Sequence, residues 1–152
     1  MDLSAELPRL IPLAIAWAEE NSALILREGI PLSEEGTKLA LLVGVKDYAR
    51  VRILLVSSIP VPSDPVLQSA CEQLQFLGPN TQGLTLGPGI FVKKGFEAGR
   101  GLIAHELRHV AQYEEYSSIG DYLSVYIPEL IRFGYAAAPL ERDAQRAAAR
   151  VV

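Results

Sequence analysis

The stretch His105-Glu106-Leu107-Arg108-His109 decides the prediction of both fold and function. It contains the only two histidines of the 152-residue chain, four positions apart, with a glutamate after the first. On a helix, residues four apart lie on one face about one turn apart. Two imidazoles in this arrangement can hold one Zn²⁺, with Glu106 close enough to act on a zinc-bound water. The pentapeptide therefore predicts a zinc site on a helix, and a zinc-dependent peptidase is the leading interpretation.

The flanking residues fit a buried metal-binding helix, which we expect to run from about Gly101 to Tyr116. Leu102 to Ala104 and Val110-Ala111 are apolar. The strictest form of the motif has uncharged residues in its variable positions, and Arg108 departs from that form. An arginine there can point away from the metal. Two histidines at this spacing also occur as a surface pair or as a hydrogen-bonded core pair, and the glutamate between them favours the metal.

A catalytic zinc site needs a third protein ligand and an open position. Because no third histidine exists in the chain, this ligand has to be a carboxylate. Glu114 and Glu115 lie five and six residues after His109, which turns them away from the metal-binding face. Asp121 and Glu129 remain candidates, and so does Asp143.

Glu141 is the strongest candidate for the third ligand. It lies in the first turn of a helix predicted from Leu140 to about Arg150, after Pro139. It shares one helical face with Ala144 and Ala148, by steps of three and four residues. Small residues on that face would let this helix approach the motif helix closely. The alternative is an acidic residue placed for the helix dipole, or a capping pair with the next arginine.

The rest of the chain predicts helices around a small sheet, which is an α+β class. The β-branched segment from Val51 to Val56 indicates a buried strand. Two short extended pieces around Gly87-Pro88-Gly89 suggest an edge strand, because proline is tolerated there. Further helices are expected at about Ile11–Glu28, Ser33–Gly44, Asp64–Phe76 and Asp121–Phe133.

Composition limits the possible partners. A net charge of −4 and a pI near 5.2 disfavour nucleic acid, because no basic stripe is available to neutralise phosphates. A single cysteine, Cys71, excludes an internal disulfide and suits a reducing compartment, so we expect a cytoplasmic protein. The apolar run from Leu10 to Ala18 is too short to span a bilayer, and it suggests core packing or a homodimer contact.

These motifs resemble a known group of proteins. His105 to Gln112, followed by Pro139-Leu140-Glu141-Arg142-Asp143-Ala144, is similar to the minimal gluzincin-type zinc metallopeptidase domains of bacteria, which combine H-E-x-x-H with a downstream E-x-x-A. The resemblance covers about residues 50 to 150. It implies a zincin-like fold, with an edge strand over the active-site helix and with helical N- and C-terminal parts. It also implies His105, His109 and Glu141 as Zn²⁺ ligands and Glu106 as the general base.

We therefore expect a single domain over residues 1–152, with N-terminal helices in 1–49 and a metal-binding core in 50–152. Its substrate would be a peptide or protein, aligned as an added strand along Leu84 to Val92. Tyr135 is a candidate second donor to the developing oxyanion, with buried aromatic packing as the alternative. Two other hypotheses stay open: a non-catalytic zinc-binding module that stabilises a fold or partner interface, and a metal-free scaffold.

Overall fold

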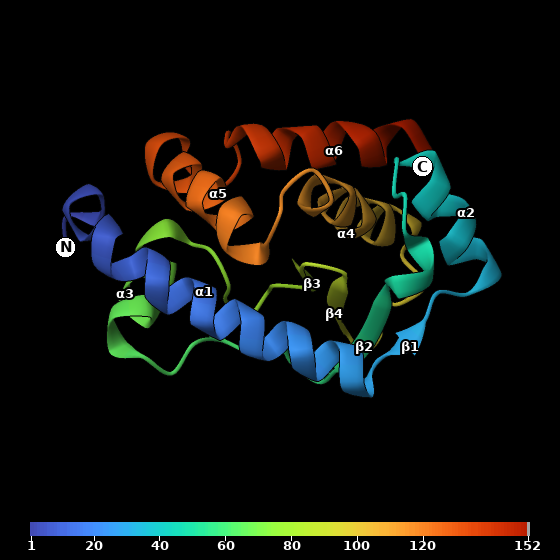
Figure 1. The fold of residues 1–152 in the computed structure, drawn as a ribbon, viewed down its shortest axis with the longest axis horizontal. Coiled ribbons are helices and arrows are strands. Elements are labelled where there is room, and N and C mark those ends of the chain that lie inside the picture. The colour runs from blue at the N-terminus through green and yellow to red at the C-terminus, as the bar shows by residue number, and fades with distance from the viewer. Residues whose placement is uncertain (152) are drawn as a thin grey trace.

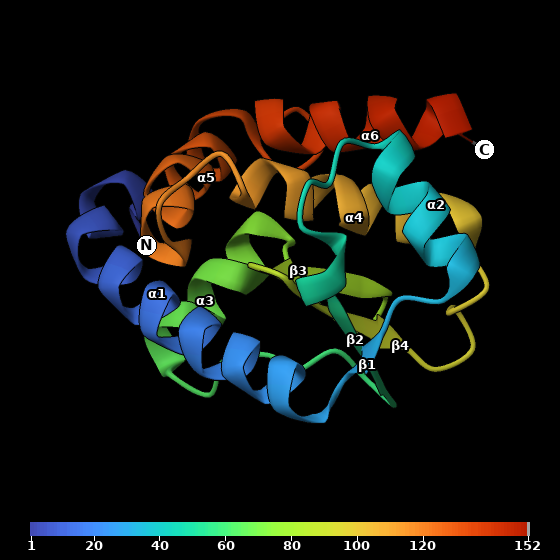
Figure 2. The ribbon, with the colours of Figure 1, turned by 45° about the vertical axis from the view of Figure 1, so that its right-hand side comes forward.

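A four-stranded mixed sheet lies at the centre of the molecule, between helices on both of its faces (Figures 1 and 2). The structure is a computed structural model that describes residues 1–151. The strands are β1 (Ile30–Pro31), β2 (Arg52–Val56), β3 (Gly83–Leu86) and β4 (Gly89–Lys93), in the spatial order β1-β2-β4-β3. β2 runs parallel to β4, and both outer pairs are antiparallel. The described residues confirm the α+β class, and β3 is an edge strand as expected.

Six α-helices and one short 3-10 helix, Tyr48–Arg50, surround this sheet in the described residues. The α-helices are α1 (Leu3–Glu28), α2 (Glu34–Leu42), α3 (Pro65–Leu74), α4 (Arg100–Tyr113), α5 (Ile119–Phe133) and α6 (Pro139–Val151). The N-caps Ser33 and Asp64 accept hydrogen bonds from backbone N–H groups in their first turns. The sequence predicted these two helix starts.

The first helix is longer than its sequence indicates. It begins at Leu3 and continues through Pro8 and Pro12, whereas we expected it to begin near Ile11. The Asp2 side chain caps its first turn, and Leu10 is buried against α3 in a small apolar cluster. Capping and tertiary packing therefore outweigh the two prolines, which each remove one helical hydrogen bond.

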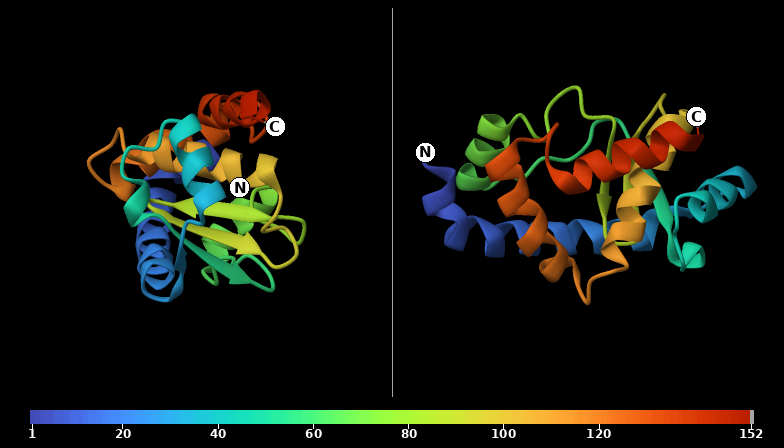
Figure 3. Two further views of the ribbon diagram at one scale, coloured as in Figure 1. Left: turned by 90° about the vertical axis from the view of Figure 1, so that its right-hand side faces the viewer. Right: turned by 90° about the horizontal axis from the view of Figure 1, so that it is seen from above.

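The two faces of the sheet pack on different helices. Ile90 and Val92 of β4 lie against α4, with Leu107 fully buried at that contact. Phe91 points to the opposite face and packs in the cluster that contains Ile25 of α1. Figure 3 shows the resulting layers, with α6 over α4, α4 over the sheet, and α1 beneath it.

The close packing of α6 on α4 follows from small side chains. Ala144 is fully buried and Ala148 is nearly so, on the face of α6 that carries Glu141. This confirms the expected small-residue face. It brings a side chain from the end of the chain next to the pentapeptide, which lies more than thirty residues earlier.

Several helix boundaries differ from the sequence prediction, and one strand was missed. α4 ends at Tyr113, three residues before the expected end, and Tyr116 lies beyond it. β1 was not predicted: Ile30 and Pro31, which follow the expected end of the first helix at Glu28, pair with Ile53 and Arg52 of β2. None of the described helices combines the length and apolar character needed to cross a bilayer.

The buried position of Leu107 generates a stability prediction. Leu107→Ala removes a fully buried side chain between the two histidines, and we expect it to lower the free energy of unfolding by about 2–5 kcal/mol. Leu42→Ala is the matched control, because Leu42 is 63% exposed and should change stability by less than about 0.5 kcal/mol. Urea unfolding measures both. Equal losses in the two variants would contradict the packing described.

Candidate metal centre

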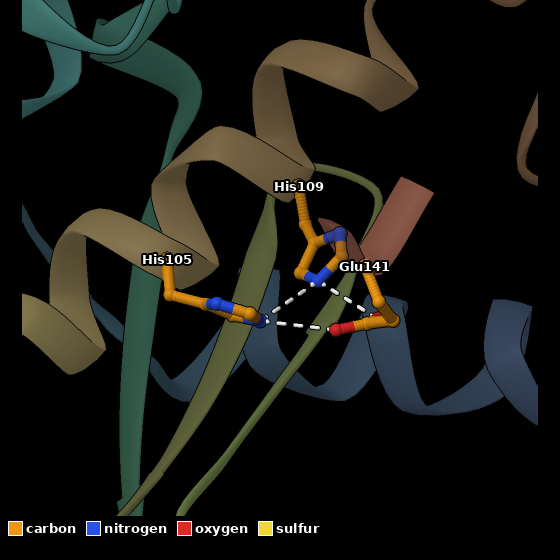
Figure 4. Close-up of side chains that lie close together, drawn as sticks. All are labelled: His105, His109 and Glu141. Atoms are coloured by element: carbon orange, nitrogen blue, oxygen red, sulfur yellow. Dashed lines mark hydrogen bonds and ion pairs between the residues drawn. The ribbon is translucent and has the colours of Figure 1, made fainter. Parts of the chain in front are cut away.

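His105, His109 and Glu141 converge at the contact between α4 and α6 (Figure 4). The two histidine Nε2 atoms lie 3.2 Å apart. Nε2 of His105 is 3.1 Å from Glu141 Oε1, and Nε2 of His109 is 3.0 Å from Glu141 Oε2. The structure thus brings together the three residues that the sequence predicted as metal ligands.

These separations suit a tetrahedral metal ion. Zinc binds imidazole nitrogen and carboxylate oxygen at about 2.0–2.2 Å, so ligand atoms around it lie about 3.3 Å apart. The distances of 3.0–3.2 Å within the cluster need only a small expansion to reach that geometry. The residue types and the geometry both fit zinc.

A glutamine fixes the tautomer of His109. The Gln112 amide nitrogen donates to the Leu140 carbonyl oxygen and to Asp143 Oδ2, both at 2.8 Å. Its oxygen therefore faces His109 Nδ1 at 2.8 Å, and it also accepts a hydrogen bond from the Tyr122 hydroxyl. His109 Nδ1 must carry the proton in this network, which leaves the Nε2 lone pair free for a metal.

The cluster needs a positive charge. If His109 were neutral, the Nε2 lone pair would face the Glu141 carboxylate oxygen at 3.0 Å with no proton between them. Burial lowers the pKa of His109, but the hydrogen bond and charge of Glu141 raise it above its ordinary value overall. Either a proton or a metal ion at Nε2 removes the conflict, so the geometry is that of a cation site.

Glu141 is almost fully buried, at 2% exposure, yet it is held in its ionised form. Burial alone would raise its pKa, but hydrogen bonds from His105 and His109 hold that pKa well below its usual range. The hydroxyl of Tyr126 on α5 donates to Glu141 Oε2 at 2.6 Å. Tyr126 therefore orients the carboxylate, a role that the sequence did not reveal.

Arg108, the departure from the strict motif, points away from the cluster. Its guanidinium bonds to Asp143 on α6, with Nε 2.8 Å from Oδ2, and to the Val43 carbonyl oxygen at 2.7 Å. Asp143 in turn accepts the hydrogen bond from Gln112. Arg108 therefore supports the second histidine from outside the site, and Asp143 is a supporting residue with no direct contact to the two histidines.

Glu106 is buried on the side of α4 that faces the edge strand. The Thr85 hydroxyl lies 2.8 Å from Glu106 Oε1 and 3.0 Å from the Glu106 backbone oxygen. Gly83, two residues earlier on β3, makes room for this carboxylate. A Cβ at Gly83 would lie 3.1–3.2 Å from Glu106 Cγ, Cδ and Oε2, so a larger residue would displace the carboxylate.

The other predicted residues lie in different places. Tyr135 borders the same cavity as the cluster, with its ring 5.8 Å from that of Phe76. Glu129 accepts a hydrogen bond from the Leu140 backbone at the start of α6, and Asp121 is exposed at the start of α5. Glu114 accepts hydrogen bonds from two backbone N–H groups of another loop, away from the site as its spacing indicated.

A cavity of about 1150 Å³ opens beside the cluster. Its walls include all three ligand candidates, the Glu106 side chain and the edge strand β3. Its far end lies between α1, α3 and α5. The half-buried His105, the buried His109 and the two buried glutamates are therefore accessible from a space large enough for a ligand.

Comparison with known proteins gives one similarity. A family model described as the eCIS core domain matches residues 56–117, which run from the end of β2 past the end of α4 and include the pentapeptide. This is less than half of the chain, and it leaves out α1, α6 and Glu141. No curated protein and no solved structure matches the chain.

The cluster generates a prediction for metal binding. One equivalent of Zn²⁺ should raise the melting temperature of metal-free protein, because an ion that binds only the folded state stabilises it. His109→Ala and Glu141→Ala should remove most of this shift. Asp121→Ala, which changes an exposed carboxylate, should keep it. A full shift in Glu141→Ala would show that another carboxylate is the third ligand, with Glu129 and Asp143 next to be tested.

The amide network generates a second prediction. Gln112→Ala should weaken zinc binding by about 10–100-fold, because His109 loses the acceptor that fixes its tautomer. Gln145→Ala is the matched control, since Gln145 is exposed on α6 and borders the cavity. Competition with a chelating zinc indicator measures both affinities. If the two variants bind zinc equally well, the glutamine does not support the ligand.

Proposed function

We propose that this protein is a zinc-dependent peptide hydrolase with a zincin-like arrangement of its site. The observation that carries the proposal is the position of Glu106. Its buried carboxylate opens onto the same cavity as the cluster of His105, His109 and Glu141, at the free edge of the sheet. A general base, a metal-ligand set and a strand with one free edge together fit hydrolysis of an extended peptide.

Zinc held by this ligand set would lower the pKa of a water to about 7 and polarise the scissile carbonyl. Glu106 then acts as the base that accepts the proton of the attacking water. Oε1 is held by Thr85, which leaves Oε2 toward Gly83 as the free oxygen. The same carboxylate delivers the proton to the leaving amine, so it returns to its starting state.

The edge strand would align the substrate. The Lys93 N–H donates to the Gln82 carbonyl oxygen, and Leu84 pairs with Phe91, so alternate residues of β3 are hydrogen-bonded to β4. The N–H and C=O groups of Gly83 and Thr85 therefore point to the free edge. An extended peptide can pair with them as a fifth strand, and this places its backbone beside Glu106.

Tyr135 supplies the second hydrogen-bond donor in this proposal. Burial and the nearby Glu141 charge raise the pKa of its phenol above the ordinary value, so the hydroxyl keeps its proton at neutral pH. Tyr126 is less suited, because it is buried and its hydroxyl donates to Glu141 at 2.6 Å, whereas Tyr135 is 39% exposed. The Tyr135 side chain borders the cavity and can donate to the oxygen of the carbonyl under attack.

One observation favours a second candidate, a non-catalytic zinc module. Glu141 lies on α6 and both histidines lie on α4, so a zinc ion would cross-link the two helices and stabilise their packing. The family model that matches residues 56–117 is named for the core of contractile injection systems, and its name states no reaction. The module would need the three ligands but not Glu106.

Glu106→Gln separates the two candidates. We expect it to lower peptide cleavage by about 10²–10⁴-fold, because a general base is lost, and to leave zinc bound. Glu115→Gln is the control, since Glu115 is exposed and pairs only with Lys46. Cleavage of a mixed peptide library, followed by mass spectrometry, measures activity. Zinc-loaded wild-type protein that cleaves nothing would contradict the hydrolase and support the module.

A further inference from the structure

We infer that the cavity beside the metal cluster selects peptides by one large apolar side chain, which it takes up between α1, α3 and α5. The inference rests on the proposed peptide hydrolysis for the nature of its ligand. The pocket itself is made by residues outside the cluster, from helices that have no part in the zinc motif.

The cavity is large enough to hold a bulky side chain. Its volume is about 1150 Å³, whereas a cavity of roughly 150 Å³ lined by apolar side chains already binds benzene. The space therefore accommodates a bulky side chain together with part of the peptide backbone that carries it.

The far wall of this cavity is apolar. Each of the three helices contributes a half-buried side chain to it: Trp17 from α1, Cys71 from α3 and Ile127 from α5. Burial raises the pKa of the Cys71 thiol to about 11, so it stays neutral and acts as part of this apolar surface. Transfer of a large apolar side chain from water to such a wall is favourable.

The charged groups around the cavity exclude acidic side chains. Among the described residues that line it, the charged ones other than histidine are Glu72, Glu106 and Glu141, and none is lysine or arginine. A carboxylate that entered the part of the cavity between α1, α3 and α5 would lose water, meet the like charge of Glu72 and find no lysine or arginine to pair with. An acidic residue should therefore bind worse than alanine at the same position of a peptide.

The edge strand leads a peptide side chain into the pocket. Successive side chains of a strand alternate between the two faces of a sheet. Thr85 faces α4 and bonds to Glu106, whereas Leu84 and Leu86 face the side covered by α1 and pack in its apolar cluster. A strand added beside β3 would therefore direct every second side chain toward the space between α1, α3 and α5.

Trp17 allows a direct test, because it is the only tryptophan of the chain and lines the pocket. Its emission is followed while zinc-loaded Glu106→Gln protein is titrated with blocked seven-residue peptides of alanine and glycine. One central residue is varied as phenylalanine, leucine, alanine or aspartate. We expect phenylalanine and leucine to bind at least tenfold more tightly than alanine, and aspartate most weakly.

Substitutions at two positions of α1 provide a test of the pocket and its matched control. Ala14 lines the pocket, so Ala14→Phe and the milder Ala14→Leu should fill it. In both variants the ratio of affinities for the phenylalanine and alanine peptides should fall toward one. Ala16 is exposed on the same helix, and Ala16→Phe should keep the preference. Melting temperature and zinc affinity show whether each variant is folded with its cluster intact.

Metal-free protein distinguishes the failure of this inference from the failure of the proposed function. If the protein hydrolyses no peptide but metal-free protein still binds the phenylalanine peptide most tightly, the inferred pocket is supported and the proposed hydrolase is contradicted. Equal affinities for phenylalanine, alanine and aspartate would overturn the inference, even in an active enzyme. Tighter binding of decanoate than of the phenylalanine peptide would also overturn it, because the pocket would then be a lipid site.

Discussion

The buried Glu141 carboxylate, held between two histidines, is the interaction on which the site depends. It joins α6 to α4 across a contact where Ala144 leaves room for close approach. A carboxylate this deeply buried is costly unless hydrogen bonds and positive charge compensate it. The chain meets that requirement with His105, His109 and the Tyr126 hydroxyl. The residues that would ligate a metal are thus also residues that hold two helices together.

The supporting network explains why an arginine is tolerated inside the motif. Arg108 neutralises Asp143, Asp143 fixes the Gln112 amide, and that amide fixes the proton on His109. Each step uses a residue of α4 or of α6. The cluster is therefore preorganised before a metal arrives, and its geometry demands a cation at Nε2 of His109.

The sequence predicted the parts of the structure that follow from local spacing. Helical steps of four and of three residues identified the two histidines and the face that carries Glu141, and a proline-containing turn identified the edge strand. Apart from the contact of Glu141 with the two histidines, contacts between distant segments were not predictable. No residue near Thr85 in the sequence indicates that it bonds to Glu106. Pro8 and Pro12 led to a start of α1 that was too late, because the packing of this segment on α3 outweighs the two prolines. Gln112 lies three residues after His109 and so shares its side of the helix, but this spacing does not reveal that it fixes the His109 tautomer.

The central claim is that His105, His109 and Glu141 bind one zinc ion together. X-ray absorption at the zinc edge of protein loaded with one equivalent tests it most directly. We predict a four-coordinate ion with two imidazole nitrogens and a carboxylate oxygen at about 2.0–2.2 Å, and one further light atom. A sulfur at about 2.3 Å, or a shell with fewer than two imidazoles, would contradict the account.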